Sequence, residues 1–130
     1  MLGNYSVEIE DFAERHFIKS FQKKYKNKWD FTLRAIVEEL ARIDNLLFTE
    51  RAETIVDAGD VKIIKTKFRV IDTKESANTS GNRCIVLLNK SMRLVSILLV
   101  YCKTDIDEKN ETASWKAIIK ENYPEYKKFF

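Results

Sequence analysis

Cationic side chains recur at every second position of one short stretch of this sequence, a spacing that suits an RNA backbone. Lys65, Lys67 and Arg69 lie among β-branched residues, and side chains two apart share one face of a strand. With a rise of about 3.3 Å per residue, such cations stand about 6.5 to 7 Å apart, close to the phosphate spacing of an extended single strand. Like charges in a row repel one another unless they meet an anion. The pattern predicts a polyanion-binding surface, with RNA as the leading candidate and a solvated sheet edge as the alternative.

Positive charge is concentrated in the middle of the chain. Nine Lys and Arg residues lie between positions 61 and 103 against two acidic residues, whereas the whole chain of 130 residues has a formal net charge of +3. A basic segment within a nearly neutral chain is typical of proteins that bind polyanions. The nine cations are Lys62, Lys65, Lys67, Arg69, Lys74, Arg83, Lys90, Arg93 and Lys103.

Composition predicts one folded domain, residues 1–130, in the cytoplasm. A hydrophobic fraction of 45% is enough for a core. The longest apolar stretch, 94–102, is far shorter than the roughly 20 residues that span a bilayer, and residues 1–10 lack the features of a secretory signal. Cys84 and Cys102 lie in apolar strand-like runs, as free thiols do. With the single His16 they are too few for a zinc site, so we expect no metal and no cofactor.

Periodicity predicts an α+β fold in which helices pack on an antiparallel sheet of about four strands. The predicted strands are 4–9, 61–71, 83–89 and 93–103. Between the first two lie two helices that should form an antiparallel pair, the second of them capped by Asp30 and carrying an apolar stripe through Ile36 and Leu40. A last helix, capped by Thr112 and containing Trp115, should end before Pro124.

The helical pair, the basic strand 62–69, the Ser80-Gly81-Asn82-Arg83 entry into a strand and the ending 99–103 together resemble the RelE/ParE superfamily of bacterial toxins. The resemblance covers about residues 5–103. It implies a RelE-like fold, a cognate antitoxin partner and, in the RelE branch, cleavage of messenger RNA on the ribosome. In that branch, lysines on the strand after the helices, an arginine after the glycine and a basic residue ending the last strand line the cleft. The matching positions are Lys65, Lys67, Arg83 and Lys103, with Lys62, Arg69 and Tyr101 as further RNA-binding candidates.

Such a site can cleave RNA without a metal. The RNA's own 2′-hydroxyl attacks the adjacent phosphorus, which requires a proton acceptor, cations to hold the developing charge and a proton donor for the departing 5′-oxygen. Fixed cations supply the electrostatic stabilisation. A planar guanidinium can hold two phosphate oxygens, so we expect Arg83, with Arg69 as an additional candidate, to act as a clamp.

Proton transfer is expected from the lysines or from a tyrosine. A lysine crowded by other cations has a lowered pKa, which suits a general acid or base. Lys65, Lys67 and Lys103 are the candidates, and the sequence does not rank them. Tyr101 could stack on a base or donate its phenol proton, and a packing role at the strand end is equally consistent with the sequence. The segment after Lys103 contains no His or Arg, unlike the acid/base region of some family members, and it reads as an acidic border.

The register of the last hairpin gives a geometric expectation. If Asn89 lies opposite Arg93 across a three-residue loop, Arg83 lies opposite Leu99, on the face that also carries Tyr101 and Lys103. A loop of two or four residues would place Arg83 on the other face. We predict the three-residue loop.

Three functions remain open on the sequence. The first is a ribosome-dependent endoribonuclease toxin that is silenced by its antitoxin. The second is a ParE-like protein that inhibits a topoisomerase such as gyrase by binding and performs no RNA chemistry. The third is a non-catalytic nucleic-acid or protein-binding module on the same scaffold. The expected partners are an antitoxin with an acidic or amphipathic segment, and mRNA on the ribosome.

Overall fold

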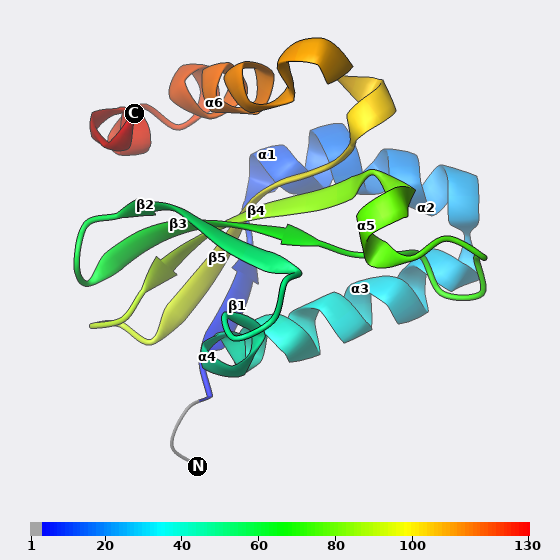
Figure 1. Ribbon diagram of the computed structural model, residues 1–130, viewed down its shortest axis with the longest axis horizontal. Coiled ribbons are helices and arrows are strands. Elements are labelled where there is room, and N and C mark those ends of the chain that lie inside the picture. Colours follow the sequence, from blue (N-terminus) through cyan, green and yellow to red (C-terminus); the bar gives the residue numbers. More distant parts are fainter. Residues whose placement is uncertain (1–3) are drawn as a thin grey trace.

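The sheet has five strands rather than about four, and it is mixed rather than wholly antiparallel. The computed structural model describes residues 4–130. The strand order across the sheet is β1-β5-β4-β3-β2, and only β1 and β5 run parallel (Figure 1). The strands are β1 (Ser6–Ile9), β2 (Ala52–Asp57), β3 (Val61–Lys67), β4 (Asn82–Asn89) and β5 (Leu94–Cys102). The predicted α+β class is confirmed.

Strand β2 escapes sequence-based prediction because its side chains do not alternate between buried and exposed. It forms one edge of the sheet, pairs only with β3 and contains no fully buried residue. Its ladder shifts register between Thr54 and Val56. An edge strand with a bulge has neither a period of two nor a continuous apolar run.

The predicted pair of N-terminal helices is present. Its first arm is an unbroken succession of three short helices, of which the middle one is a π-helical turn, and its second arm starts after a sharp turn at Lys26, where φ is +52°. The elements are α1 (Asp11–Ala13), η1 (Glu14–Ile18), α2 (Lys19–Tyr25), α3 (Asn27–Ala41) and the short α4 (Ile43–Leu46). Helix α3 therefore starts three residues before Asp30, the predicted cap.

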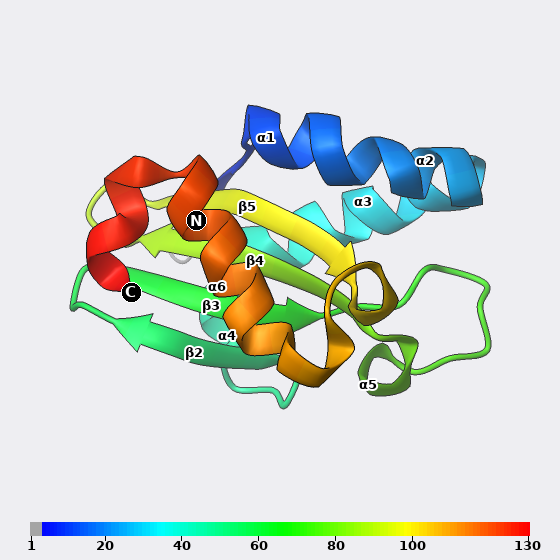
Figure 2. The same ribbon diagram turned by 90° about the horizontal axis from the view of Figure 1, so that it is seen from above.

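The C-terminal part of the chain covers the other face of the sheet. Helix α6 (Glu111–Asn122) ends before Pro124, as predicted, although it starts at Glu111 rather than after Thr112. It crosses the sheet on the side opposite to α3 (Figure 2). Short helical turns flank it: η2 (Lys103–Asp105), η3 (Glu108–Asn110) and η4 (Pro124–Phe129). Both faces of the central strands are therefore buried, which explains their nearly continuous apolar sequences.

Two hydrophobic cores result from this arrangement. The N-terminal helices pack on one face of the sheet, where Trp29 of α3 is fully buried beside Phe21 and Phe68. Helix α6 packs on the other face through Trp115 and Ile119, both 0% exposed. The β4–β3 and β4–β5 pairs form the centre of the molecule, and their ends position the candidate site.

The hairpin register differs from the prediction in a way that still places Arg83 and Tyr101 on one face. Asn89 pairs with Leu94, so the loop has four residues, and the predicted three-residue loop is wrong. Leu98 is then an extra residue on β5, because Ile85 pairs with Leu99 whereas Val86 pairs with Ile97. This bulge shifts the register by one residue, and Arg83 lies opposite Tyr101 rather than Leu99. The loop and the bulge compensate each other.

The helices can also be compared with the requirements for a membrane-spanning segment. Across residues 4–130, no helix has the length and apolar character needed to cross a bilayer.

Candidate nucleic-acid interface

Three predicted site residues form a row across neighbouring strands at one end of the sheet. Lys67 of β3 pairs with Arg83 of β4, and Arg83 pairs with Tyr101 of β5. Directly paired residues share one face of a sheet, so these side chains belong to the face covered by α6. Lys65 lies on the same face, two residues further along β3.

Main-chain carbonyl groups of a short helix bind the Arg83 side chain. It is 4% exposed, and its guanidinium donates hydrogen bonds from Nη1 to the carbonyl oxygens of Ala77 and Asn82, at 3.3 and 2.9 Å, and from Nη2 to that of Asn78, at 3.2 Å. Ala77 and Asn78 belong to α5 (Ala77–Ser80), whose start is capped by Ser76. The predicted bidentate phosphate clamp therefore does not fit this arrangement, because the Arg83 fork is already bound to main-chain carbonyls. Arg83 instead places a fixed positive charge beneath the surface.

Tyr101 is also buried, and its hydroxyl binds a residue that the sequence reasoning missed. It is 0% exposed, and its hydroxyl donates a hydrogen bond of 2.7 Å to Oε2 of Glu111, the first residue of α6. The predicted stacking of Tyr101 on an RNA base is inconsistent with this burial. The acidic segment after Lys103 was the only sign in the sequence of a nearby carboxylate, and nothing in it singled out Glu111.

Glu111 also pairs with Lys65. The distance between Lys65 Nζ and Glu111 Oε2 is 2.9 Å, and each side chain is only 14% exposed. Burial, the largest influence, acts to raise the pKa of Glu111, but hydrogen bonds from Tyr101 and Lys65 and the nearby positive charges outweigh it, so the pKa is lowered. Burial, and then the hydrogen bond to Glu111, raise the pKa of Tyr101. At neutral pH Glu111 is therefore ionised and Tyr101 is protonated.

Of the two cations in the row, Lys67 is the one that remains available to bind an anion. It is half-buried, and within residues 4–130 no carboxylate forms an ion pair with it. Lys65 and Lys67 line a depression of about 400 Å³ at the β2–β3 edge, together with Glu50, Arg51, Ala52 and Glu53.

Lys103 lies at the same end of the sheet as the row but beyond the strand. Strand β5 ends at Cys102, and the Lys103 main-chain N–H donates a hydrogen bond to the carbonyl oxygen of Gly81, at 2.8 Å. Gly81 has a φ of +78°, a conformation that a glycine adopts without strain. Lys103 is half-buried. The structure therefore places it next to the entry into β4, near Arg83 in the fold.

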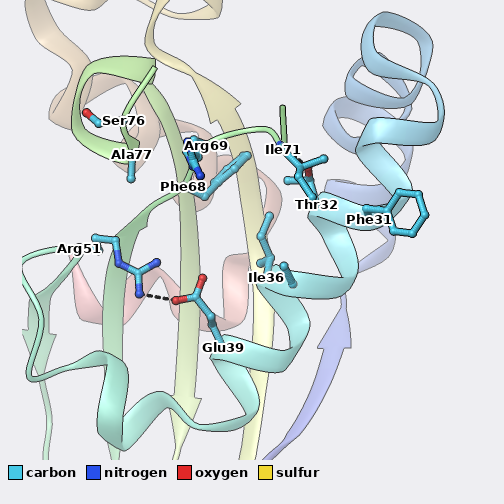
Figure 3. Close-up of a pocket in the computed structure, with 11 residues that line it drawn as sticks. Phe31, Thr32, Ile36, Glu39, Arg51, Phe68, Arg69, Ile71, Ser76 and Ala77 are labelled. Carbon is cyan, nitrogen blue, oxygen red and sulfur yellow. Dashed lines mark hydrogen bonds and ion pairs between the residues drawn. The ribbon is translucent and has the colours of Figure 1, made fainter. Parts of the chain in front are cut away.

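Two other predicted residues lie apart from the row. Lys62 has the opposite strand parity, near the other end of β3, and pairs with Asp57 at 3.7 Å. Arg69 follows the end of β3 and lines a pocket of about 460 Å³ between α3 and the segment 68–77 (Figure 3). The opposite wall of this pocket carries the Arg51–Glu39 ion pair (Figure 3). Lys62 therefore lies far from Lys67 along β3, and Arg69 lines a different pocket from Lys67.

The row and its neighbours bring together groups that can transfer protons and stabilise negative charge. A deprotonated carboxylate, Glu111, lies beside Lys65, with Lys67 on the same face and a buried guanidinium beneath. Carboxylates accept protons, ammonium groups donate them, and fixed cations stabilise a developing negative charge. Within residues 4–130, no three His, Cys, Asp or Glu side chains come together as a metal site needs.

The fold and this row define a small α+β protein with a cationic cluster at one end of a mixed sheet. No protein-family model matches the sequence, and no curated protein matches it. Among solved structures, the chain is similar to one in the crystal structure of an archaeal RelE–RelB complex from Pyrococcus horikoshii OT3. The TM-score is 0.52 and the identity is 14%, over 77% of this chain and 96% of that chain. The fold is therefore RelE-like, as the sequence resemblance predicted.

Proposed function

We propose that this chain is the toxin of a toxin–antitoxin pair and that it cleaves messenger RNA on the ribosome, in the cytoplasm. The observation that carries the proposal is the alignment of Lys67, Arg83 and Tyr101 on three adjacent strands of a RelE-like sheet. The similar archaeal protein is part of a RelE–RelB complex, which supports an antitoxin as a partner of this chain too.

The proposed reaction proceeds by attack of the 2′-hydroxyl on the adjacent phosphorus, without a metal or a cofactor. Glu111 accepts the proton of the 2′-hydroxyl as the new O2′–P bond forms. The P–O5′ bond breaks, and an ammonium group, that of Lys67 or Lys103, donates a proton to the departing 5′-oxygen. The products are a 2′,3′-cyclic phosphate and a 5′-hydroxyl end.

Electrostatic stabilisation comes from several cations at once. Lys65 and Lys67 face the phosphate, and Arg83 contributes its charge from below through a low-dielectric environment. Tyr101 is a positioning residue in this scheme, because its hydroxyl holds the Glu111 carboxylate at 2.7 Å and is itself fully buried.

The test compares Lys67→Ala with Lys62→Ala during induced expression in bacteria. Both lysines lie on β3, but Lys62 is near the far end of the strand and pairs with Asp57. We expect the wild type and Lys62→Ala to stop growth and cleave transcripts, and Lys67→Ala to lose both effects. The double variant Lys67→Ala/Arg83→Ala should be equally inactive. Transcript cleavage by Lys67→Ala at the wild-type rate would refute the assignment.

A non-catalytic binding module is the second candidate. It is favoured by the burial of Arg83 and Tyr101 and by the neutralisation of Lys65, which leave few free groups for chemistry. If the wild-type protein is harmless when expressed, this second function takes precedence. Growth arrest with intact transcripts and blocked DNA supercoiling would instead indicate a ParE-like gyrase inhibitor.

The antitoxin is proposed to neutralise the toxin by covering its cationic surface or by packing on the N-terminal helical pair. An acidic segment complements Lys67 and its neighbours, and an amphipathic helix suits a surface of helices. Co-expression of a short reading frame adjacent to the gene should restore growth and allow the two chains to be purified together. Failure of every adjacent frame to do so would contradict the pairing.

A further inference from the structure

A second pocket lies on the opposite face of the same sheet end, behind the row. It has a volume of about 350 Å³, within the range of small-molecule sites, and is formed between the first helical arm and the ends of β4 and β5. Its lining residues are His16, Phe17, Ser20, Phe21, Lys24, Tyr25, Asn82, Cys102 and Asp105. Asn82 and Cys102 directly precede Arg83 and directly follow Tyr101, respectively, so their side chains belong to the other face.

Asn82 is the unusual member of this pocket. It is only 5% exposed, and its main-chain groups are used by Ser80, Phe68 and Arg83. Its side-chain carboxamide, however, makes no hydrogen bond to any of the residues 4–130. The carboxamide atoms are not among the fully buried polar atoms that lack a partner, so they are open to the space of the pocket. A buried amide that offers a donor and an acceptor to a pocket is suited to a ligand with a matching edge.

The remaining walls are aromatic and charged. Phe17, Phe21 and Tyr25 recur at every fourth residue of one helical arm, and the first of them lies in the π-helical turn η1, a feature frequent at functional sites. Aromatic rings bind the flat faces of nucleobases, and Asn pairs with adjacent donor and acceptor groups on the edge of adenine. Asp105 can accept a hydrogen bond from an exocyclic amine, and Lys24 provides a cation for a phosphate.

We propose that this pocket binds an adenine base, with the Asn82 carboxamide reading its edge and the half-buried side chains of Phe17 and Tyr25 packing on its face. The base can come from a free adenine nucleotide or from an unstacked adenosine of an RNA strand, since both present the same group. The site lies on the face of the sheet opposite to Lys67, so adenine binding does not depend on whether the chain cleaves RNA.

The experiment is an NMR titration of the full-length ¹⁵N-labelled protein with AMP, CMP and ribose 5-phosphate. AMP should shift the side-chain amide signal of Asn82 and the main-chain signals of Ser20 and Asp105, and it should bind at least fivefold more tightly than CMP. Ribose 5-phosphate should leave the Asn82 signal unchanged. An AMP titration that moves none of these signals, or an equal response to ribose 5-phosphate, overturns the proposal.

Two variants make the assignment specific. Asn82→Ala removes a carboxamide that has no partner among residues 4–130, and it should weaken AMP binding at least tenfold. Ser20→Trp fills the pocket from an exposed position and should abolish binding, whereas the matched control Lys19→Trp, on the neighbouring exposed residue, should bind as the wild type does. Wild-type affinity in Ser20→Trp would refute the pocket even if Asn82→Ala failed to fold.

The source of the base is decided by a dinucleotide. Adenylyl-adenosine that binds tenfold or more tightly than AMP indicates that an RNA strand is the ligand, because further contacts then contribute. Equal affinities indicate a free nucleotide.

Discussion

Replacement of Glu111 by glutamine is the sharpest test of the interface, because it removes one charge and preserves the shape of the side chain. The carboxylate accepts hydrogen bonds from Tyr101 and Lys65 at 2.7 and 2.9 Å. A hydrogen bond to a charged group contributes about 1.5–3 kcal/mol. Because both partners of the ion pair are 14% exposed, solvent screens part of this energy. We expect the free energy of unfolding to fall by about 1–2 kcal/mol, measured by urea denaturation at pH 7.

The same substitution should separate RNA binding from RNA cleavage. Loss of the proton acceptor should slow cleavage of mRNA on translating ribosomes by about 10²- to 10⁴-fold, the usual contribution of general base catalysis. Loss of this negative charge should strengthen RNA binding, and about 1 kcal/mol, the interaction of two unit charges roughly 4 Å apart in water, corresponds to roughly fivefold. Fluorescence anisotropy with a short labelled RNA at low salt measures this second effect.

The matched control is Glu121→Gln, which removes an exposed carboxylate from the same helix. It should change neither stability nor cleavage. Wild-type cleavage by Glu111→Gln would refute the role of Glu111 as proton acceptor. Unchanged RNA affinity would refute the location of the RNA at this end of the sheet, and unchanged stability would mean that the ion pair with Lys65 is not formed in solution.

Four further predictions concern the rest of the scaffold. Trp115→Ala should lower the free energy of unfolding by about 3–5 kcal/mol, because it leaves a cavity under α6, whereas Trp115→Phe should cost less since the buried indole N–H has no hydrogen-bond partner among residues 4–130. The pKa of Glu111 is lowered in the folded state, so ionised Glu111 adds to the free energy of unfolding above its ordinary pKa of 4.5. This contribution is lost as the pH falls through the lower folded pKa. The free energy of unfolding should therefore fall less steeply with acid in Glu111→Gln than in the wild type. Arg83→Met should accelerate amide hydrogen exchange in the segment 76–80, which the guanidinium holds, and exchange at the wild-type rate would contradict that role. Burial raises the pKa of the Cys84 thiol to about 12, so a thiol reagent at pH 8 should modify Cys102 alone, and a second modified thiol in the native protein would contradict the burial of Cys84.

Local sequence patterns determined much of the scaffold. The apolar alternation after Gly59, the apolar runs of β4 and β5 and the helical stripe through Ile36 and Leu40 each specify an element through contacts that lie close in the chain. The resemblance to RelE-type toxins rested on the order of these elements, and the fold confirms it. Strand β2 was not predicted because its extended conformation depends on pairing with β3, and its own side chains show no strand pattern.

The composition of the site was decided by tertiary structure. Lys65 and Lys67 share one face of β3 because they are two residues apart, and this follows from the sequence alone. Glu111, by contrast, reaches Lys65 only because α6 folds back over the sheet, and the bulge at Leu98 decides that Arg83 lies opposite Tyr101. Burial then assigned the roles, since it turned Arg83 from a clamp into a fixed internal charge. Sequence spacing fixes which face of an element a side chain occupies. Which distant carboxylate, carbonyl or pocket it meets depends on the packing of elements far apart in the chain, because hydrogen bonds and ion pairs act only over a few ångströms.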